Sequence, residues 1–495
     1  MFMARTESRP LQSRRGRAAG AAPACGCVAH GPAMRWAHRR LENDLLHRMA
    51  AGGPAEAARP FGAFRADSAF MGEPLACAKP LVLTNIRLFD GVTASLRDGL
   101  CVRIEGNRVA DIQPAGPRQE GVESLDCGGR VLMPGLIDAH WHSMLCGISQ
   151  LAAMTADTPY IHLNAARQAQ NTLMRGFTSV RDAGGPSFSL KRAIDEGLVH
   201  GPRIFPSGAM VSQTGGHGDF RMPYEVPSRP DILSHPEAAG ICAIANGRDE
   251  VLRRAREQLM LGASQLKLMA GGGVTSLYDP LTSVQFTEDE LRAGVQAAAD
   301  WGTYVMVHVY GAQGIQRALR AGVRSIEHGQ LADEETVRMM ADHGAWWSLQ
   351  PFFGDDDANP HADPRSHAKQ QMVAEGTERA YALAQRFNIQ TAWGTDILFA
   401  PDKLARHGHM LAKLTRLYAP LDLLRMATGQ NGQLLGMSGA RNPYGASVGC
   451  IAAGSLADLL VVDGDPSRDL DFLTDPQANL RLIMKDGKIY KNALA

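Results

Sequence analysis

Short runs of β-branched and other apolar residues alternate with stretches of helical periodicity through the middle of the chain. The clearest helical stretches are at 249–261, 287–301, 315–321 and 333–343, where apolar residues recur at the spacing of a helix face. Parallel strands joined by helices and repeated in this way predict an α/β fold, a (β/α)8 TIM barrel. The eight strand candidates end near His142, Asp182, Ser207, Met269, Val309, His328, Gln350 and Thr395.

The two ends of this pattern differ from its middle, because apolar and polar residues alternate there as in hairpin strands. Such runs occur at 81–89, 101–104 and 109–112, and again at 457–462 and 482–490. Neither piece is large enough for a core of its own, so we expect both to pair into one small β-sandwich. The predicted domains are a β-sandwich from 76–133 and 445–495 and a catalytic barrel from 134–444.

Two long insertions, 208–245 and 351–385, follow strands of the predicted barrel. Segments that follow barrel strands lie on the face that carries the active site. We therefore expect both insertions to form a lid or the wall of a pocket.

Residues 1–75 are rich in Ala, Gly, Pro and Arg and contain few large apolar residues outside 41–49. This composition favours a disordered leader. An organelle-targeting leader is the alternative, but the segment lacks a clean amphipathic pattern. A start codon assigned too far upstream is a further alternative, with Met71 as the true start.

Composition limits the classes of partner. The chain of 495 residues has 51 basic and 51 acidic residues, 45% hydrophobic and 21% charged residues, so nothing indicates nucleic acid. Its eight cysteines have irregular spacing, which predicts reduced thiols and a cytoplasmic location. No apolar run approaches the roughly 20 residues that span a bilayer, so no membrane partner is expected.

Six residues that could bind metal occupy the ends of strand candidates, where a β/α barrel keeps its active site. The pair in Asp-Ala-His-Trp-His places two imidazoles on one side of a strand, where they can bind the same cation. The pattern therefore predicts a metallohydrolase. The six candidates are His140, His142, Lys267, His308, His328 and Asp396.

This interpretation assigns a specific chemical role to Lys267 and to Asp396. A two-metal site needs a bridging anion, and a neutral lysine amine can take up CO₂ to become a carbamate with two oxygen ligands. Lys267 points away from Leu266 and Leu268 on the pleat, hence toward a different environment. Asp396 could bind one metal, take the proton of the attacking water and return it to the leaving amine.

The chain resembles the amidohydrolase superfamily from about residue 81 to 491. The resemblance rests on Pro-Gly-Leu-Ile-Asp-Ala-His-Trp-His at 134–142, Thr-Gly-Gly-His-Gly-Asp at 214–219, Lys267 with the glycines 271–273, His-Val-Tyr-Gly at 308–311, Ser-Ile-Glu-His-Gly at 325–329 and Gly-Thr-Asp at 394–396. It implies that His140, His142 and Asp396 hold one metal and His308 and His328 the other, with carboxylated Lys267 as the bridge.

Within the superfamily the chain is similar to the imidazolonepropionase-like and prolidase-type branch, including bacterial amidohydrolases that hydrolyse ochratoxin A. The resemblance implies two divalent metal ions, with zinc expected, and a homo-oligomer, for which an octamer is one form. It also implies that Tyr310 contacts a substrate carboxylate and that His217 faces the substrate.

Several alternatives remain beside these assignments. Trp346, Trp347, Phe352 and Phe353 suit core packing as well as an aromatic substrate pocket. The glycines 271–273 lack the ending of a phosphate loop, so close approach of the backbone beside the metals is the preferred role. Other histidines, among them His162, His407 and His409, are interpreted as structural or surface residues.

Enzymes with competing functions would differ from this chain at single residues. A deaminase of the superfamily would carry Glu where this chain has Gly311, and a dihydroorotase-like cyclic amidase would carry Arg in place of Met144. The expected reaction is hydrolysis of N-acyl amino acids or dipeptides with a free C-terminal carboxylate, including ochratoxin A. The alternatives are an Xaa-Pro or Xaa-Arg/Lys dipeptidase, an imidazolonepropionase-like cyclic amide hydrolase, and a catalytically silent barrel scaffold.

Overall fold

The computed structural model describes residues 75–76, 79–116, 121–227, 232–276, 278–358, 361 and 363–494. The predicted leader lies outside the described residues except for its last position, Leu75, which begins a short strand. The structure therefore bears on the barrel and on the strands that flank it in sequence.

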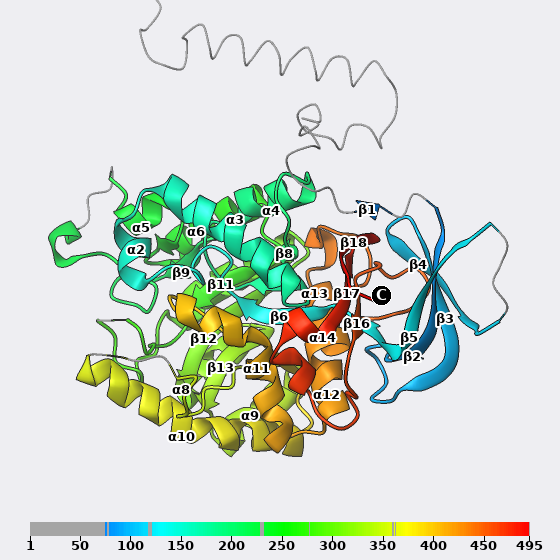
Figure 1. Cartoon of the computed structure of the whole chain (residues 1–495). Helices are drawn as coiled ribbons and strands as arrows, with labels where there is room; N and C mark the ends of the chain where they lie inside the picture. Colours follow the sequence, from blue (N-terminus) through cyan, green and yellow to red (C-terminus); the bar gives the residue numbers. More distant parts are fainter. Residues whose placement is uncertain are drawn as a thin grey trace, which may run out of the picture. The chain divides into compact units, whose positions relative to one another are not determined.

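Strands from both ends of the described chain form one mixed sheet of eight strands, as the sequence pattern predicts (Figure 1). The seam between the two ends is an antiparallel pair in which Leu460 lies opposite Met133. One face buries Leu83, Val102 and Leu482 in a common apolar cluster. In sheet order the strands are β1 (Leu75–Ala76), β18 (Lys488–Asn492), β17 (Leu480–Lys485), β16 (Leu459–Val462), β5 (Glu123–Pro134), β2 (Leu81–Leu88), β3 (Arg97–Glu105) and β4 (Arg108–Pro114).

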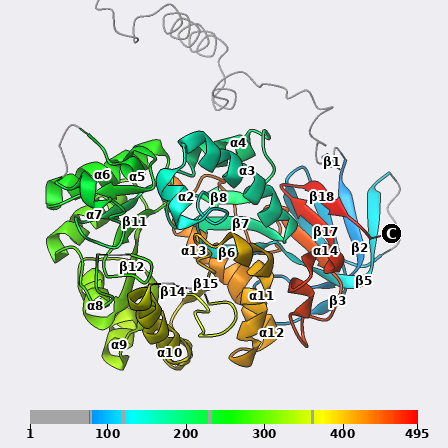
Figure 2. The ribbon, with the colours of Figure 1, turned by 60° about the vertical axis from the view of Figure 1, so that its left-hand side comes forward.

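The remaining strands are parallel and lie inside a ring of helices, as expected for a β/α barrel (Figure 2). After the last strand, the Asp396 N–H donates to the His140 carbonyl oxygen at 2.9 Å and so joins the end of the barrel to its beginning. The strands are β6 (Leu136–Trp141), β7 (Phe177–Asp182), β8 (Arg203–Phe205), β9 (Met210–Ser212), β10 (Cys242–Ile244), β11 (Leu266–Met269), β12 (Val305–Gly311), β13 (Ser325–Leu331), β14 (Trp346–Leu349) and β15 (Thr391–Trp393).

The third predicted strand is β8, which ends at Phe205, close to the predicted end near Ser207; a further strand that was not predicted, β9, lies within the insertion 208–245. β8 pairs with β7, whereas β9 pairs with β11 on the other side. Pro206 follows β8 and has no backbone N–H, so it cannot continue the hydrogen-bond ladder. The insertion 208–245 adds β10, which pairs with β9.

The four predicted helices are present with ends within a few residues of the prediction. Their boundaries have local causes: Gly262 ends α6 with φ +113°, and the Thr287 hydroxyl accepts a bond from the Glu290 N–H at the start of α7. The α-helices of the described chain are α2 (Gln150–Thr155), α3 (Thr158–Met174), α4 (Phe188–Asp195), α5 (His235–Ala238), α6 (Arg248–Leu261), α7 (Glu288–Asp300), α8 (Ala312–Arg320), α9 (Glu334–Asp342), α10 (Pro364–Arg386), α11 (His407–Ala412), α12 (Pro420–Arg425), α13 (Asn431–Gly436) and α14 (Pro476–Asn479).

Alternation along the strands separates an apolar shell from a polar barrel interior. Leu268, Val307 and Ile326 point outward into the core cluster shared with the helices, while residues between them, such as Lys267 and His308, point inward. The insertion 351–385 consists largely of helix α10. Among the described helices, none combines the length and the apolar composition that a bilayer crossing requires.

Candidate metal centre and substrate pocket

Four imidazoles, one lysine and one carboxylate meet where the barrel strands end. The four histidines and Lys267 are at most 4% exposed. His140, His142 and Asp396 place one ligand atom each within 4.8 Å of one another, a spacing that can hold one cation. The ring of His328 lies 4.8 Å from that of His140 and 4.5 Å from that of His308. The structure therefore brings together all six residues that the sequence singles out.

Short distances connect these side chains. Nε2 of His142 lies 3.1 Å from Asp396 Oδ1, and Nε2 of His140 lies 3.5 Å from the same oxygen. Lys267 Nζ lies 3.5 Å from His140 Nε2. Imidazole nitrogens and carboxylate oxygens are preferred ligands of zinc, so the donor set fits a divalent metal.

Each imidazole has one nitrogen bonded to an oxygen acceptor outside the ligand set, and the second nitrogens of His140 and His142 face Lys267 and Asp396. Nδ1 of His140 donates to Glu327 Oε2 at 2.7 Å, and Nδ1 of His142 donates to the Gly184 carbonyl at 2.9 Å. Such outer partners fix the tautomer of a metal-binding histidine. The remaining two bonds are from His308 Nε2 to the Gly272 carbonyl at 3.1 Å and from His328 Nδ1 to Gln350 Oε1 at 2.7 Å.

Burial gives Lys267 the property that carbamate formation needs. It lowers the pKa of the ammonium group to about 8, so the neutral amine is accessible near neutral pH. A neutral amine 3.5 Å from His140 Nε2 fits the expected bridging carbamate.

Glu327 and Arg181 support His140 from inside the barrel, and sequence reasoning missed both. Both side chains are fully buried, and Arg181 Nη2 donates to the two Glu327 oxygens at 2.8 and 2.7 Å. Burial opposes ionisation of Glu327, but Arg181 and His140 hold its pKa well below the usual range. Glu327 was visible in the motif Ser-Ile-Glu-His-Gly, whereas no local signal connects Arg181 to it.

Two of the candidate ligands have left-handed backbone conformations. φ is +73° at His328 and +53° at Asp396, values that are uncommon outside glycine. At His328 this turn breaks the strand alternation, so that Glu327 and His328 both face the centre of the barrel. Strained backbone of this kind concentrates at functional sites.

Asp138 is a further residue that the sequence analysis did not assign. It accepts hydrogen bonds from the His140 N–H at 2.9 Å, from the Thr395 hydroxyl at 2.6 Å and from His407 Nε2 at 2.9 Å. His407 is stacked between Trp141 and Phe177 and is fully buried, which agrees with the structural interpretation of this histidine. The carboxylate of Asp138 thus connects the two ends of the barrel under the metal centre.

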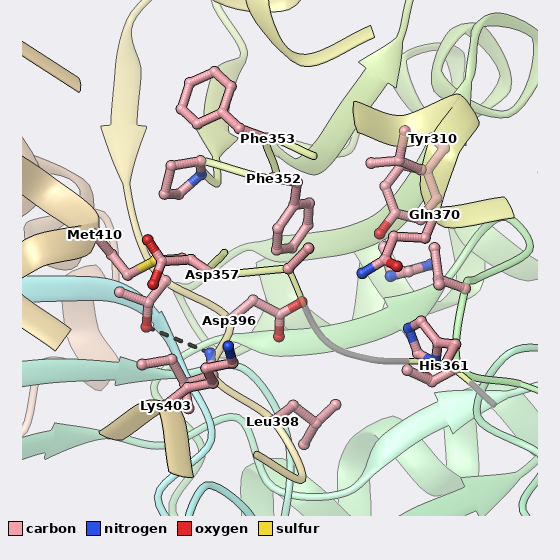
Figure 3. Close-up of a pocket in the computed structure, with 18 of the residues that line it drawn as sticks. Tyr310, Phe352, Phe353, Asp357, His361, Gln370, Asp396, Leu398, Lys403 and Met410 are labelled. Carbon is pink, nitrogen blue, oxygen red and sulfur yellow. Dashed lines mark hydrogen bonds between the residues drawn. The ribbon is translucent and has the colours of Figure 1, made fainter. Parts of the chain in front are cut away.

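A cavity of about 880 Å³, including its open mouth, lies over this centre. Asp396 points into it, with Tyr310 and Gln370 to one side in the view of Figure 3. Phe352 and Phe353 line the cavity, as do Asp357 and His361 of the insertion 351–385, which therefore forms pocket wall as expected. The Tyr310 hydroxyl has no hydrogen-bond partner in the part of the chain that the structure describes.

His217 also lines the cavity. Its ring stacks on His308 with centroids 3.9 Å apart, and its Nδ1 lies 2.8 Å from the Ser276 hydroxyl. A Cβ at Gly273 would lie 1.9 Å from the His217 ring, so glycine is required by this close approach. The glycine run therefore serves close packing beside the histidines, as its sequence indicates.

Trp346 and Trp347 do not line the cavity, which corrects their assignment to the substrate pocket. They begin β14 and so lie at the end of the strand opposite to the cavity. Trp346 packs in the barrel interior with Tyr304 and Met306, whereas Trp347 faces the outer core and donates from Nε1 to the His328 carbonyl at 2.7 Å. The predicted end of this strand near Gln350 already placed both tryptophans at its start, away from the face that carries the site.

Comparison with known sequences matches this chain to one protein family. A model of the amidohydrolase family matches residues 131–490. Ochratoxinase from Aspergillus niger is 31% identical over 380 residues, which are 73% of this chain and 76% of that protein. Imidazolonepropionase from Rhodococcus jostii is 24% identical over 397 residues, 77% of this chain and 86% of that protein.

Two solved structures match a larger share of this chain than the two sequence relatives do. A prolidase complexed with N-methylphosphonate-L-proline has a TM-score of 0.76 at 33% identity and covers 83% of this chain and 100% of that chain. The A. niger ochratoxinase crystal structure has a TM-score of 0.72 at 28% identity and covers 84% of this chain and 96% of that chain. Both are similar to this chain over nearly all of its described residues.

Proposed function

This chain belongs to the amidohydrolase family and is a metal-dependent hydrolase of carbon–nitrogen bonds, and from that premise we propose that it cleaves N-acyl amino acids and dipeptides with a free C-terminal carboxylate. The observation that carries the proposal is the position of Asp396 in the cavity, with its carboxylate 3.1 Å from His142 Nε2 and with Tyr310 on one side of it (Figure 3).

His140, His142 and Asp396 would hold one divalent metal ion, zinc by expectation, and His308 and His328 a second, with carboxylated Lys267 between them. Metal ions bound there would polarise the amide carbonyl and lower the pKa of water. Asp396 takes the proton of the attacking water and delivers it to the amide nitrogen as the C–N bond breaks. The products are the acyl carboxylic acid and the free amino acid.

Tyr310 orients the substrate through the carboxylate of its amino-acid half. Its hydroxyl stays protonated, because burial and the charge of Asp396 raise its pKa well above the usual value. A protonated hydroxyl donates a hydrogen bond to a carboxylate, a bond that is stronger than one between neutral groups. Holding the substrate there places its amide bond over Asp396.

An aromatic substrate such as ochratoxin A, cleaved to ochratoxin alpha and phenylalanine, is the first candidate. The aromatic rings of Phe352 and Phe353 on the cavity wall and the similarity to ochratoxinase support it. A dipeptidase of prolidase type is the second candidate, supported by the similarity to the prolidase bound to N-methylphosphonate-L-proline. Both classes carry the free carboxylate that Tyr310 would bind.

Kinetics on a panel of ochratoxin A, N-benzoyl amino acids and Xaa-Pro dipeptides would test the proposal with zinc-loaded enzyme. Asp396→Asn should abolish turnover on every substrate while binding changes little, because it removes proton transfer and keeps the side-chain shape. Tyr310→Phe should raise KM for substrates with a free carboxylate and leave their methyl esters nearly unaffected. Cleavage of lactams or lactones without cleavage of any linear amide on the panel would refute the proposal.

A further inference from the structure

The substrate cavity has a cation on the side away from Tyr310. Lys403 lies in the 3-10 helix Pro401–Arg406, is half-buried and lines the cavity with Leu398 and Met410. Its Nζ donates to the backbone carbonyl of Asp356 at 2.8 Å. Among the described residues, no carboxylate lies within ion-pair distance of Lys403.

Asp357, a buried acid that lines the same cavity, is already paired with other side chains. Asp357 lies 3.1 Å from Lys413 Nζ and 3.4 Å from His409 Nε2, and it also pairs with Arg406. Although burial opposes its ionisation, these hydrogen bonds and charges lower the pKa of Asp357 to about 2. The charge of Lys403 is therefore left available on the cavity side.

The same contacts hold Lys403 in place. The segment after β14 carries Asp356 and Asp357, and the segment after β15 carries Lys403 and Arg406. Two bonds between these segments fix the lysine against the cavity wall. An anchored cation loses less conformational freedom when it binds a ligand than a mobile surface lysine does.

The cavity extends to both sides of Asp396. In Figure 3, Tyr310 lies on one side of Asp396, and Lys403 and Met410 lie on the other. A substrate whose amide bond is at Asp396 and whose carboxylate is at Tyr310 extends its acyl half toward Lys403. The wall along that path includes the apolar side chains of Phe352 and Leu398.

We infer that Lys403 forms an anion subsite for the acyl half of the substrate. The class of substrate it selects is an N-acyl amino acid whose acyl group is apolar or aromatic near the amide and carries an acidic substituent, a carboxylate or a phenolate, at its far end. The inference rests on the proposed function and adds a second specificity determinant to it. A hydrogen bond between two charged groups in a partly closed pocket corresponds to roughly a tenfold preference.

Paired substrates with zinc-loaded full-length enzyme would measure this preference. We would compare kcat/KM for N-(4-carboxybenzoyl)-L-phenylalanine, N-benzoyl-L-phenylalanine and N-(4-aminomethylbenzoyl)-L-phenylalanine. The enzyme should prefer the carboxybenzoyl substrate over the benzoyl substrate about tenfold, mainly through KM. In Lys403→Met the ratio should fall to about one, and in Lys403→Glu the aminomethyl substrate should become the preferred one.

Lys488→Met is the matched control, because Lys488 is an exposed lysine of β18 that does not line the cavity, and it should leave the ratio at the wild-type value. If the wild-type enzyme cleaves N-benzoyl-L-phenylalanine without a preference for the carboxybenzoyl substrate, the subsite is refuted and the proposed function stands. If the preference for the carboxybenzoyl substrate persists in both Lys403 variants, the subsite is likewise refuted and the proposed function stands. If none of the three amides is cleaved, the subsite is refuted, whereas the proposed function is decided by the ochratoxin A and Xaa-Pro dipeptides of the panel above.

Discussion

Replacing Glu327 by Gln would test whether the buried carboxylate organises the metal centre. The change keeps the shape of the side chain and removes its charge. Arg181 would then lose its counter-ion while staying fully buried, and its acceptors would all be neutral: the amide oxygen of the new Gln, the Ala139 carbonyl at 2.6 Å, the Tyr304 hydroxyl at 3.3 Å and the Ser325 hydroxyl at 3.1 Å. These neutral groups cannot replace a carboxylate.

Two magnitudes follow from this environment. Removing one partner of a buried ion pair costs about 3–5 kcal/mol, because the other charge stays buried without compensation. The second effect is on the metal, since His140 donates from Nδ1 to Glu327 at 2.7 Å. Loss of such an outer partner typically weakens metal binding by about 10–100-fold.

Both effects can be measured separately. Urea unfolding of the metal-free protein would report the free energy of unfolding, and competition with a chromophoric chelator would report metal affinity. Glu334→Gln is the control, because Glu334 pairs with Arg338 and Arg386 on the surface, where an ion pair contributes at most about 1 kcal/mol. An unfolding free energy within about 1 kcal/mol of wild type together with unchanged metal affinity would refute the role assigned to Glu327.

Three further predictions concern separate parts of the molecule. Lys267→Ala should lower the metal content measured by elemental analysis and abolish most of the activity, and short carboxylic acids should restore part of that activity. Full metal content and activity in this variant would exclude Lys267 as a ligand. Gly273→Ala should reduce kcat/KM at least tenfold, because the new methyl group would displace His217, and wild-type kinetics would contradict that contact. Burial lowers the pKa of His407 from 6.5 to about 4, so the unfolded chain binds the extra proton between these values. Stability present above pH 6.5 should therefore fall as the pH drops toward 4, and His407→Gln should flatten this part of the urea-midpoint profile; an unchanged profile would show that His407 is not responsible.

The chemistry of the site was largely accessible from sequence. A His-x-His pair at a strand end and single ligand types at the ends of other strands predict convergence, because parallel strands of a barrel end on the same face. The inward direction of Lys267 followed from its apolar neighbours Leu266 and Leu268, since a strand alternates its side chains. The structure places each of these residues accordingly.

Other features depended on contacts between distant parts of the chain. Arg181 and Glu327 lie 146 positions apart, so no local pattern could pair them. The two tryptophans of β14 are of a residue type that is typical of an aromatic substrate pocket, yet their position at the start of the strand places them in the core.

The amino-acid sequence by itself determined the strand and helix order, the ligand types and the face on which they meet, because periodicity and residue chemistry act locally. Only the tertiary structure decided that Glu327 and His328 both face the interior, that β9 and β10 of the insertion 208–245 join the barrel sheet, and that Lys403 reaches the substrate cavity. The physical reason is that backbone dihedrals at strand ends and the packing of long loops are set by neighbours far away in the chain, whose positions the local pattern does not contain.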